Sequence, residues 1–126
     1  MGEPVVSRAE LAVVFAALRT IMARHAGLFV VEADTDDRYR LAAGWSARRK
    51  RHITAGGVEI QKHYVSYHLI PIYACADLQQ GLSPALRKRM QGKSCFNFTR
   101  VDPALMKELE QLTRVGFERF RKMTFD

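Results

Sequence analysis

The sequence contains little cysteine and no long apolar run. Its 126 residues include only two cysteines, Cys75 and Cys95, which are too few for a disulfide scaffold. No segment approaches the roughly 18 consecutive apolar residues that a membrane-spanning helix needs. The first residues lack a basic segment followed by an apolar one, so no secretory signal peptide is predicted. These absences favour a cytoplasmic protein that is not associated with a membrane.

Several motifs that carry chemistry are also missing. The four histidines form no H-E-x-x-H motif, and no Cys–His spacing resembles a zinc site. No Gly-rich phosphate loop, Ser–His–Asp order or paired-carboxylate spacing is found. The sequence therefore predicts no cofactor, no metal ligand and no catalytic residue, and it favours a binding module over an enzyme.

The composition that remains is that of a globular domain, with 48% hydrophobic and 26% charged residues. One domain over residues 1–126, with its core between about residues 7 and 122, is expected at this length. The formal net charge is +7, and it is unevenly distributed. Residues 46–100 hold ten basic and two acidic residues, so the whole excess of positive charge lies in this segment.

The N-terminal half predicts a helix followed by a hairpin. A capping box begins at Ser7, and apolar residues at helical spacing extend the helix over about residues 7–25. The β-forming residues 28–31 and the alternating residues 39–42 flank an acidic turn, which is typical of a hairpin. Residues 46–55 are polar and basic, and we expect a loop or an exposed edge strand there.

The middle of the chain predicts further strands. The pair Gly56-Gly57 is expected to mark a bulge or a tight bend. Residues 58–62 alternate between apolar and polar, and residues 64–73 form the longest β-like run. We expect these two segments to pair through a turn near His63.

The C-terminal third predicts two helices separated by a short strand. The Ser-Pro pair at 83–84 supplies an N-cap and a first-turn proline, and residues 94–99 are expected to form a strand. The Asp-Pro pair at 102–103 repeats this signal and opens the last helix, in which Gly116 is expected to allow a close approach of another backbone. The order of elements predicts an α+β domain, an antiparallel sheet of about five to six strands with the N- and C-terminal helices packed on one face.

Some polar residues of the predicted strands are candidates for a binding site. If Tyr64, Ser66 and His68 point to one face, they form a polar patch that can bind a ligand or act as acid and base. The alternative is a buried His and Ser that satisfy each other's hydrogen bonds. Cys95 is interpreted as a small hydrophobe of a sheet rather than as a nucleophile. Trp45, the only tryptophan, can line a pocket or belong to the core or its rim.

The excess positive charge forms two clusters. Their members are Arg48, Arg49, Lys50, Arg51 and His52 in the first, and Arg87, Lys88, Arg89 and Lys93 in the second. Such clusters attract phosphates, and nearby aromatic residues suit nucleic acid, whereas the alternative is a solvated loop and a polar helix face. Because no nucleic-acid motif accompanies them, nucleic acid is not the favoured partner.

Two blocks of the sequence are distinctive enough to suggest a relationship. They are K-x-Y-V-S-Y-H-L-x-P-x-Y, which begins at Lys62, and M-Q-G-K-S-C-F-N-F, which begins at Met90. Together with the surrounding residues 28–122 they resemble the YdhG-like domain family. The resemblance implies a small bacterial α+β domain with helices on a curved antiparallel sheet and a largely uncharacterised function. Part of the wider family is similar to frataxin-type iron chaperones.

These observations lead to three hypotheses of function. The first is a non-enzymatic module that binds a small, anionic ligand or a partner protein. Its candidate contacts come from the two distinctive blocks and are Lys62, Tyr64, Ser66, His68, Lys93, Cys95 and Asn97. A homodimer is compatible with so small a sheet.

The second hypothesis is a frataxin-like iron chaperone, which rests on the resemblance and on an acidic turn. The turn contains Glu32, Asp34, Asp36 and Asp37, for which a solvated hairpin is the alternative. The basic net charge works against it. The third hypothesis is nucleic-acid binding through residues 48–52 and 87–93, and an enzyme that uses His68 and Cys95 ranks last.

Overall fold

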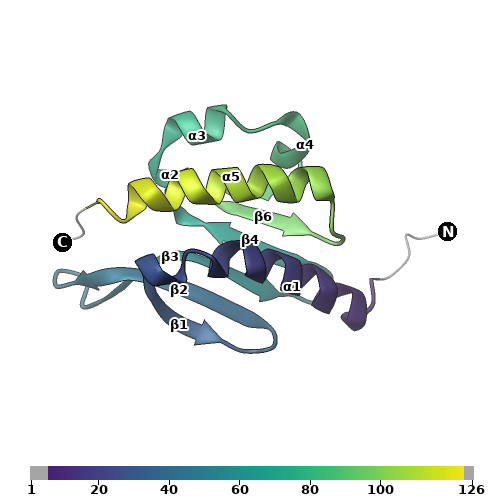
Figure 1. The fold of residues 1–126 in the computed structure, drawn as a ribbon, viewed down its shortest axis with the longest axis horizontal. Helices are drawn as coiled ribbons and strands as arrows, with labels where there is room; N and C mark the ends of the chain where they lie inside the picture. The colour runs from purple at the N-terminus through teal and green to yellow at the C-terminus, as the bar shows by residue number, and fades with distance from the viewer. Residues whose placement is uncertain (1–5, 124–126) are drawn as a thin grey trace.

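The computed structural model describes residues 6–123 and has the expected α+β class. Six strands form one antiparallel sheet in the order β1-β2-β3-β4-β6-β5 (Figure 1). The strands are β1 (Val30–Asp34), β2 (Arg38–Ser46), β3 (Arg51–Ile60), β4 (Val65–Leu69), β5 (Met90–Gln91) and β6 (Cys95–Phe98). The helices are α1 (Arg8–Ala23), α2 (Ile70–Ala74), α3 (Ala76–Gln80), α4 (Pro84–Arg87) and α5 (Pro103–Phe120), with a 3-10 turn η1 at Ala26–Leu28.

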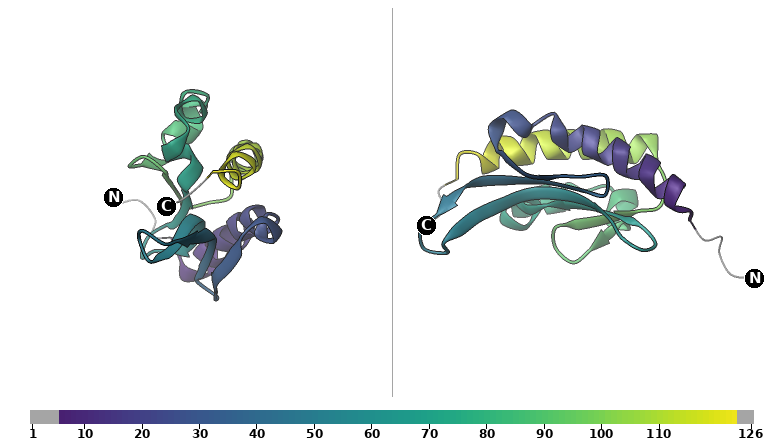
Figure 2. Two further views of the ribbon diagram at one scale, coloured as in Figure 1. Left: turned by 90° about the vertical axis from the view of Figure 1, so that its left-hand side faces the viewer. Right: turned by 90° about the horizontal axis from the view of Figure 1, so that it is seen from below.

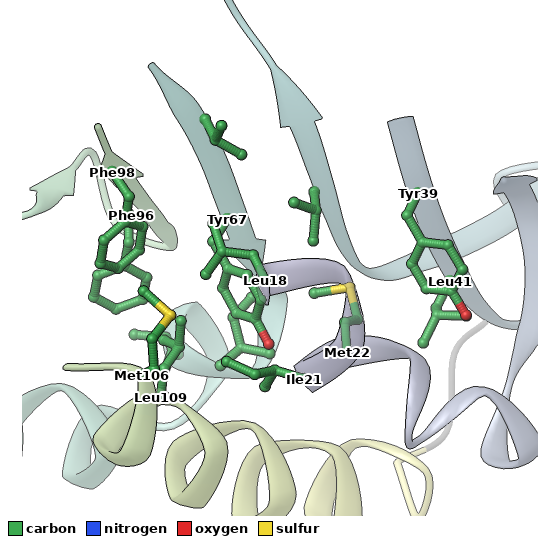
Figure 3. Close-up of a cluster of buried hydrophobic side chains, with 14 of the residues drawn as sticks. Leu18, Ile21, Met22, Tyr39, Leu41, Tyr67, Phe96, Phe98, Met106 and Leu109 are labelled. Carbon is green, nitrogen blue, oxygen red and sulfur yellow. The ribbon is translucent and has the colours of Figure 1, made fainter. Parts of the chain in front are cut away.

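The two long helices, α1 and α5, lie side by side on one face of a curved sheet (Figure 2). Alternate residues of the strands point into the space between the sheet and these helices. Figure 3 shows Tyr67 and Phe96 of the sheet on the same side as Leu18 and Leu109 of the helices, in one buried cluster. None of the helices in residues 6–123 is long and apolar enough to cross a membrane.

The predicted caps of both long helices are confirmed. The Ser7 hydroxyl accepts a hydrogen bond from the Glu10 amide, and the Glu10 carboxylate accepts one from the Ser7 amide. At the start of α5, the Asp102 carboxylate accepts from the backbone N–H groups of Ala104 and Leu105.

The predicted strand 64–73 is wrong in its second half. The chain leaves the sheet after Leu69, and residues 70–74 form the short helix α2. Pro71 explains the change, because its nitrogen carries no hydrogen for the strand ladder but suits the first turn of a helix. A Cβ atom at Gly116 would lie 3.0 Å from Cβ of Pro71, so the glycine allows the Pro71 side chain to pack closely against α5. The sequence predicted the close approach of a backbone at this position, and the neighbour is instead a side chain.

The segment 46–55 is the outer half of a long hairpin. Only residues 47–50 form a turn, whereas residues 51–55 are the first half of β3 and pair with β2. The sequence predicted either a bulge or a tight bend at Gly56-Gly57. The pair lies within β3, so the tight bend is wrong. A register shift next to Gly56 leaves Ala55 without a partner, which is the predicted bulge.

Candidate functional site: the open face of the sheet

The face of the sheet opposite α1 and α5 is open over β2, β3 and β4 (Figure 2). In β4, Val65, Tyr67 and Leu69 are buried against the helices, whereas Ser66 and His68 between them are partly exposed. The alternation follows from the two-residue period of a strand. The open face therefore presents the polar residues of these strands.

The strand register places these polar residues in two rows across the sheet. The first row consists of Arg40 (β2), Gly57 (β3), His68 (β4) and Cys95 (β6). The second row consists of Arg38, Glu59, Ser66 and Asn97 on the same four strands. Residues that are far apart in the sequence thus become direct neighbours on one surface.

A cavity of about 360 Å³ lies over these rows on β2, β3 and β4. We call it the open-face hollow, and its polar lining includes Arg38, Arg40, Arg49, Arg51, Glu59, Ser66 and His68. Ile53 and Ile70 add apolar lining. The volume falls within the range of sites for small molecules.

Gly57 leaves the floor of the open-face hollow without a side chain. It lies between Arg40 and His68 in the first row, two strand spacings of roughly 4.8 Å each. The Arg40 and His68 backbones are therefore about 10 Å apart. A small group can enter between their side chains because the central residue does not fill the space.

The electrostatics of the hollow are dominated by arginine. Arg38 is paired with Glu59, since its Nη2 lies 3.4 Å from Oε1 of the carboxylate. The guanidinium groups of Arg40, Arg49 and Arg51 form no ion pair or hydrogen bond with any residue in 6–123. Because arginine stays protonated, the hollow holds three uncompensated positive charges, which repel each other and attract an anion.

His68 is the titratable group of the hollow. Its Nε2 lies 3.0 Å from Oγ of Ser94, so one of the two ring nitrogens is already hydrogen-bonded. Burial, and then the positive charge of Arg40, lowers the pKa of His68 below its ordinary value. The ring is therefore neutral at pH 7 and offers a hydrogen-bonding group rather than a fourth charge. The alternative of a buried His68–Ser66 pair is not found, because His68 contacts Ser94 instead and Ser66 Oγ donates to the Glu59 carbonyl.

Four of the seven candidate contacts predicted from the sequence share the open face. They are Ser66, His68, Cys95 and Asn97. Only Ser66 and His68 line the hollow. Cys95 lies opposite His68 in register, but burial raises the pKa of its thiol, so it remains protonated at neutral pH. The Asn97 amide donates to the Gln91 side chain.

The other three candidates lie outside the hollow. Lys62 is exposed in the turn between β3 and β4, and Tyr64 immediately precedes β4. Lys93 lies in the turn between β5 and β6, where its Nζ is 5.5 Å from the centre of the Tyr73 ring. The distinctive blocks of sequence therefore do not gather into one pocket.

The two basic clusters are separate: the first lies at the tip of the β2–β3 hairpin, at one end of the long axis of the molecule, and the second begins at the end of α4 (Figure 1). In the first cluster, Arg49 and Arg51 line the hollow, whereas Arg48, Lys50 and His52 are exposed outside its lining. The second cluster surrounds the end of α4. There Arg87 donates to the Gln79 carbonyl at 2.7 Å, and Lys88 and Arg89 line a separate cavity of about 220 Å³ together with Arg100.

Trp45 lies apart from the open-face hollow. It is 56% exposed and lines another cavity with Leu28, Phe29 and the end of α5. Its ring packs edge-on against His52, with 5.4 Å between the ring centres. The tryptophan is therefore a rim residue rather than a contact of the predicted pocket.

Sequence reasoning missed Arg38, Arg40 and Ser94. For the two arginines a signal was available, because they alternate with the apolar Tyr39 and Leu41 on one strand. Such alternation predicts that they share the face opposite the core. For Ser94 there was no signal, because its contact with His68 depends on how β4 and β6 pair.

The acidic turn is engaged with arginines of α1. Arg19 forms a bidentate pair with Asp34, and Arg8 lies 3.8 Å from Asp37. Within residues 6–123, no three His, Cys, Asp or Glu side chains gather as a group that could hold a metal ion.

Comparison with known proteins returned no match to any family model, curated protein or solved structure. The resemblance to the YdhG-like domain family therefore stays a prediction from the two sequence blocks.

Proposed function

We propose that the protein is a binding module for a small anionic ligand, and that the open-face hollow is its site. The ligand class is a molecule with phosphate or carboxylate groups and two or three negative charges. The observation that carries the proposal is the set of three arginines, Arg40, Arg49 and Arg51, that line one cavity without an acidic partner in residues 6–123.

The shape of the hollow supports the same ligand class. Arg40 and His68 flank the side-chain-free position of Gly57, so an anionic group over Gly57 receives a guanidinium on one side and an imidazole on the other. Planar guanidinium groups bind phosphate and carboxylate in a bidentate manner. The apolar side chains of Ile53 and Ile70 in the lining suit a ligand that also has a nonpolar part.

Isothermal titration calorimetry with pyrophosphate and with citrate tests the proposal. We expect binding by the wild-type protein and an affinity at least tenfold lower in Arg40→Gln, because a hydrogen bond to a charged group contributes about 1.5–3 kcal/mol. Arg114→Gln is the matched control, since Arg114 is an exposed arginine of α5, on the other side of the sheet.

Two results would overturn the proposal. One is an absence of binding heat for both anions with the folded wild-type protein. The other is an equal loss of affinity in Arg40→Gln and Arg114→Gln, which would indicate a general effect of net charge rather than a site.

A further inference from the structure

The tip of the β2–β3 hairpin concentrates positive charge more than any other part of the sequence. Residues 46–52, which we call the arm tip, contain four consecutive cations, Arg48, Arg49, Lys50 and Arg51. Figure 1 shows this tip at one end of the long axis of the molecule. All four side chains are exposed, and only two of them line the open-face hollow.

Hydrogen bonding and backbone geometry give the arm tip a defined shape. Ser46 is fully buried, and its hydroxyl accepts a hydrogen bond from the Arg49 amide at 3.2 Å. Lys50 adopts the left-handed conformation with φ of 53°, which turns the chain back into β3. The cations are thus displayed on a built turn at the end of two paired strands.

In the part of the chain that the structure describes, the cations of the arm tip also lack the carboxylate partners that some of the other arginines have. Six arginines elsewhere in residues 6–123 are paired with carboxylates. Within residues 6–123, no carboxylate forms an ion pair with Arg48 or Lys50. Four adjacent like charges repel each other, and the negative charges of a polyanion neutralise them. The counterions released from the polyanion favour this binding further.

We infer that the arm tip is a binding surface for duplex DNA, with its cations against the phosphates that border a groove. A two-stranded ribbon fits the major groove of B-form DNA, which is roughly 12 Å wide, whereas the major groove of A-form RNA is too narrow. A single strand is less well matched. Its bases require a series of stacking aromatics, and Trp45 is the only exposed aromatic ring of the hairpin besides His52, against which it packs.

This surface extends beyond the proposed small-anion site, although it shares Arg49 and Arg51 with it. Arg48 and Lys50 do not line the hollow, so they separate the two functions. The double variant Arg48→Gln/Lys50→Gln removes two charges from the arm tip and leaves the lining of the hollow intact. Lys88→Gln/Arg89→Gln removes the same charge directly after α4, an element that lies away from the hairpin tip (Figure 1).

Fluorescence anisotropy with a labelled DNA duplex, measured over a range of salt concentrations, tests the inference. Four phosphate contacts predict that log K falls with log salt with a slope of about −3.6. We expect the arm-tip double variant to reduce the magnitude of this slope by about 1.8, and the control double variant to leave it unchanged.

The outcomes separate this inference from the proposed function. A slope whose magnitude falls by about 1.8 in the arm-tip variant, with no change in the control variant, supports the inference. An unchanged slope in that variant, an equal change in the control, tighter binding to the single strand, or no duplex binding at low salt would each overturn it. None of these results depends on whether the wild-type protein binds pyrophosphate.

Discussion

The adjacent glycines of β3 provide the sharpest test of the two-faced sheet. Gly56 faces the helices, and a Cβ atom there would lie 2.8 Å from Cε of Met22 and 2.9 Å from the His68 carbonyl oxygen. Gly57 faces the hollow, and its nearest contact would be the Tyr39 carbonyl oxygen at 3.2 Å. Alanine at the two positions therefore adds the same atom to two different environments.

We expect Gly56→Ala to lower the free energy of unfolding by about 2 kcal/mol, because overpacking of a close-packed core costs about 1–3 kcal/mol. For a domain of this size, that loss lowers the melting temperature by about 8 °C. Gly57→Ala is expected to change stability by less than about 1 kcal/mol, since only one backbone oxygen must give way. Its effect falls instead on anion affinity, because the methyl group occupies the floor of the hollow.

Urea denaturation followed by circular dichroism, together with titration by pyrophosphate, measures both effects. Gly44→Ala is the control, since nothing lies within 4 Å of a Cβ atom at that position. The assignment of faces is refuted if Gly57→Ala destabilises the protein as much as Gly56→Ala does. It is also refuted if both variants bind pyrophosphate like the wild-type protein.

Two further predictions concern polar side chains of β4. Tyr67→Phe removes the 2.6 Å hydrogen bond between the Tyr67 and Thr113 hydroxyls, and should cost about 1–3 kcal/mol because Thr113 is left buried without its partner; adding Thr113→Val should recover part of that loss in urea denaturation. The lowered pKa of His68 means that the unfolded chain binds a proton more readily than the folded protein, so stability should fall as the pH drops below the ordinary value of 6.5. Because the pKa of His25 is also lowered, His68→Gln should remove only part of this pH dependence, and a variant that retains all of it contradicts the assignment.

Much of the fold could be predicted because its signals are local. The Ser7 and Asp102 caps, and the helical spacing behind them, need only neighbouring residues to be recognised. The same holds for the hairpin around the acidic turn. The helix α2 was missed because residues 64–73 are rich in β-forming side chains, and one proline decided the structure against that preference.

The candidate site was harder to predict because it depends on strand register. Ser66 and His68 could be placed on one face from their spacing alone. That Arg40 and His68 lie on either side of Gly57 follows only from the pairing of β2 with β3 and of β3 with β4. A shift of one residue in either pairing would move the arginine or the histidine to the other face.

The two rows of the open face differ in how their charges are compensated, and this difference supports the proposal of an anion site. In the second row, Arg38 lies opposite Glu59 and is neutralised across the ladder, which is the arrangement that favours stability. In the first row, Arg40 lies opposite Gly57, so its charge has no carboxylate and the space beside it has no side chain. A sheet selected for stability alone gains from repeating the paired arrangement of Arg38 and Glu59. The departure from it coincides with the open-face hollow, where the proposed anion would supply the missing negative charge.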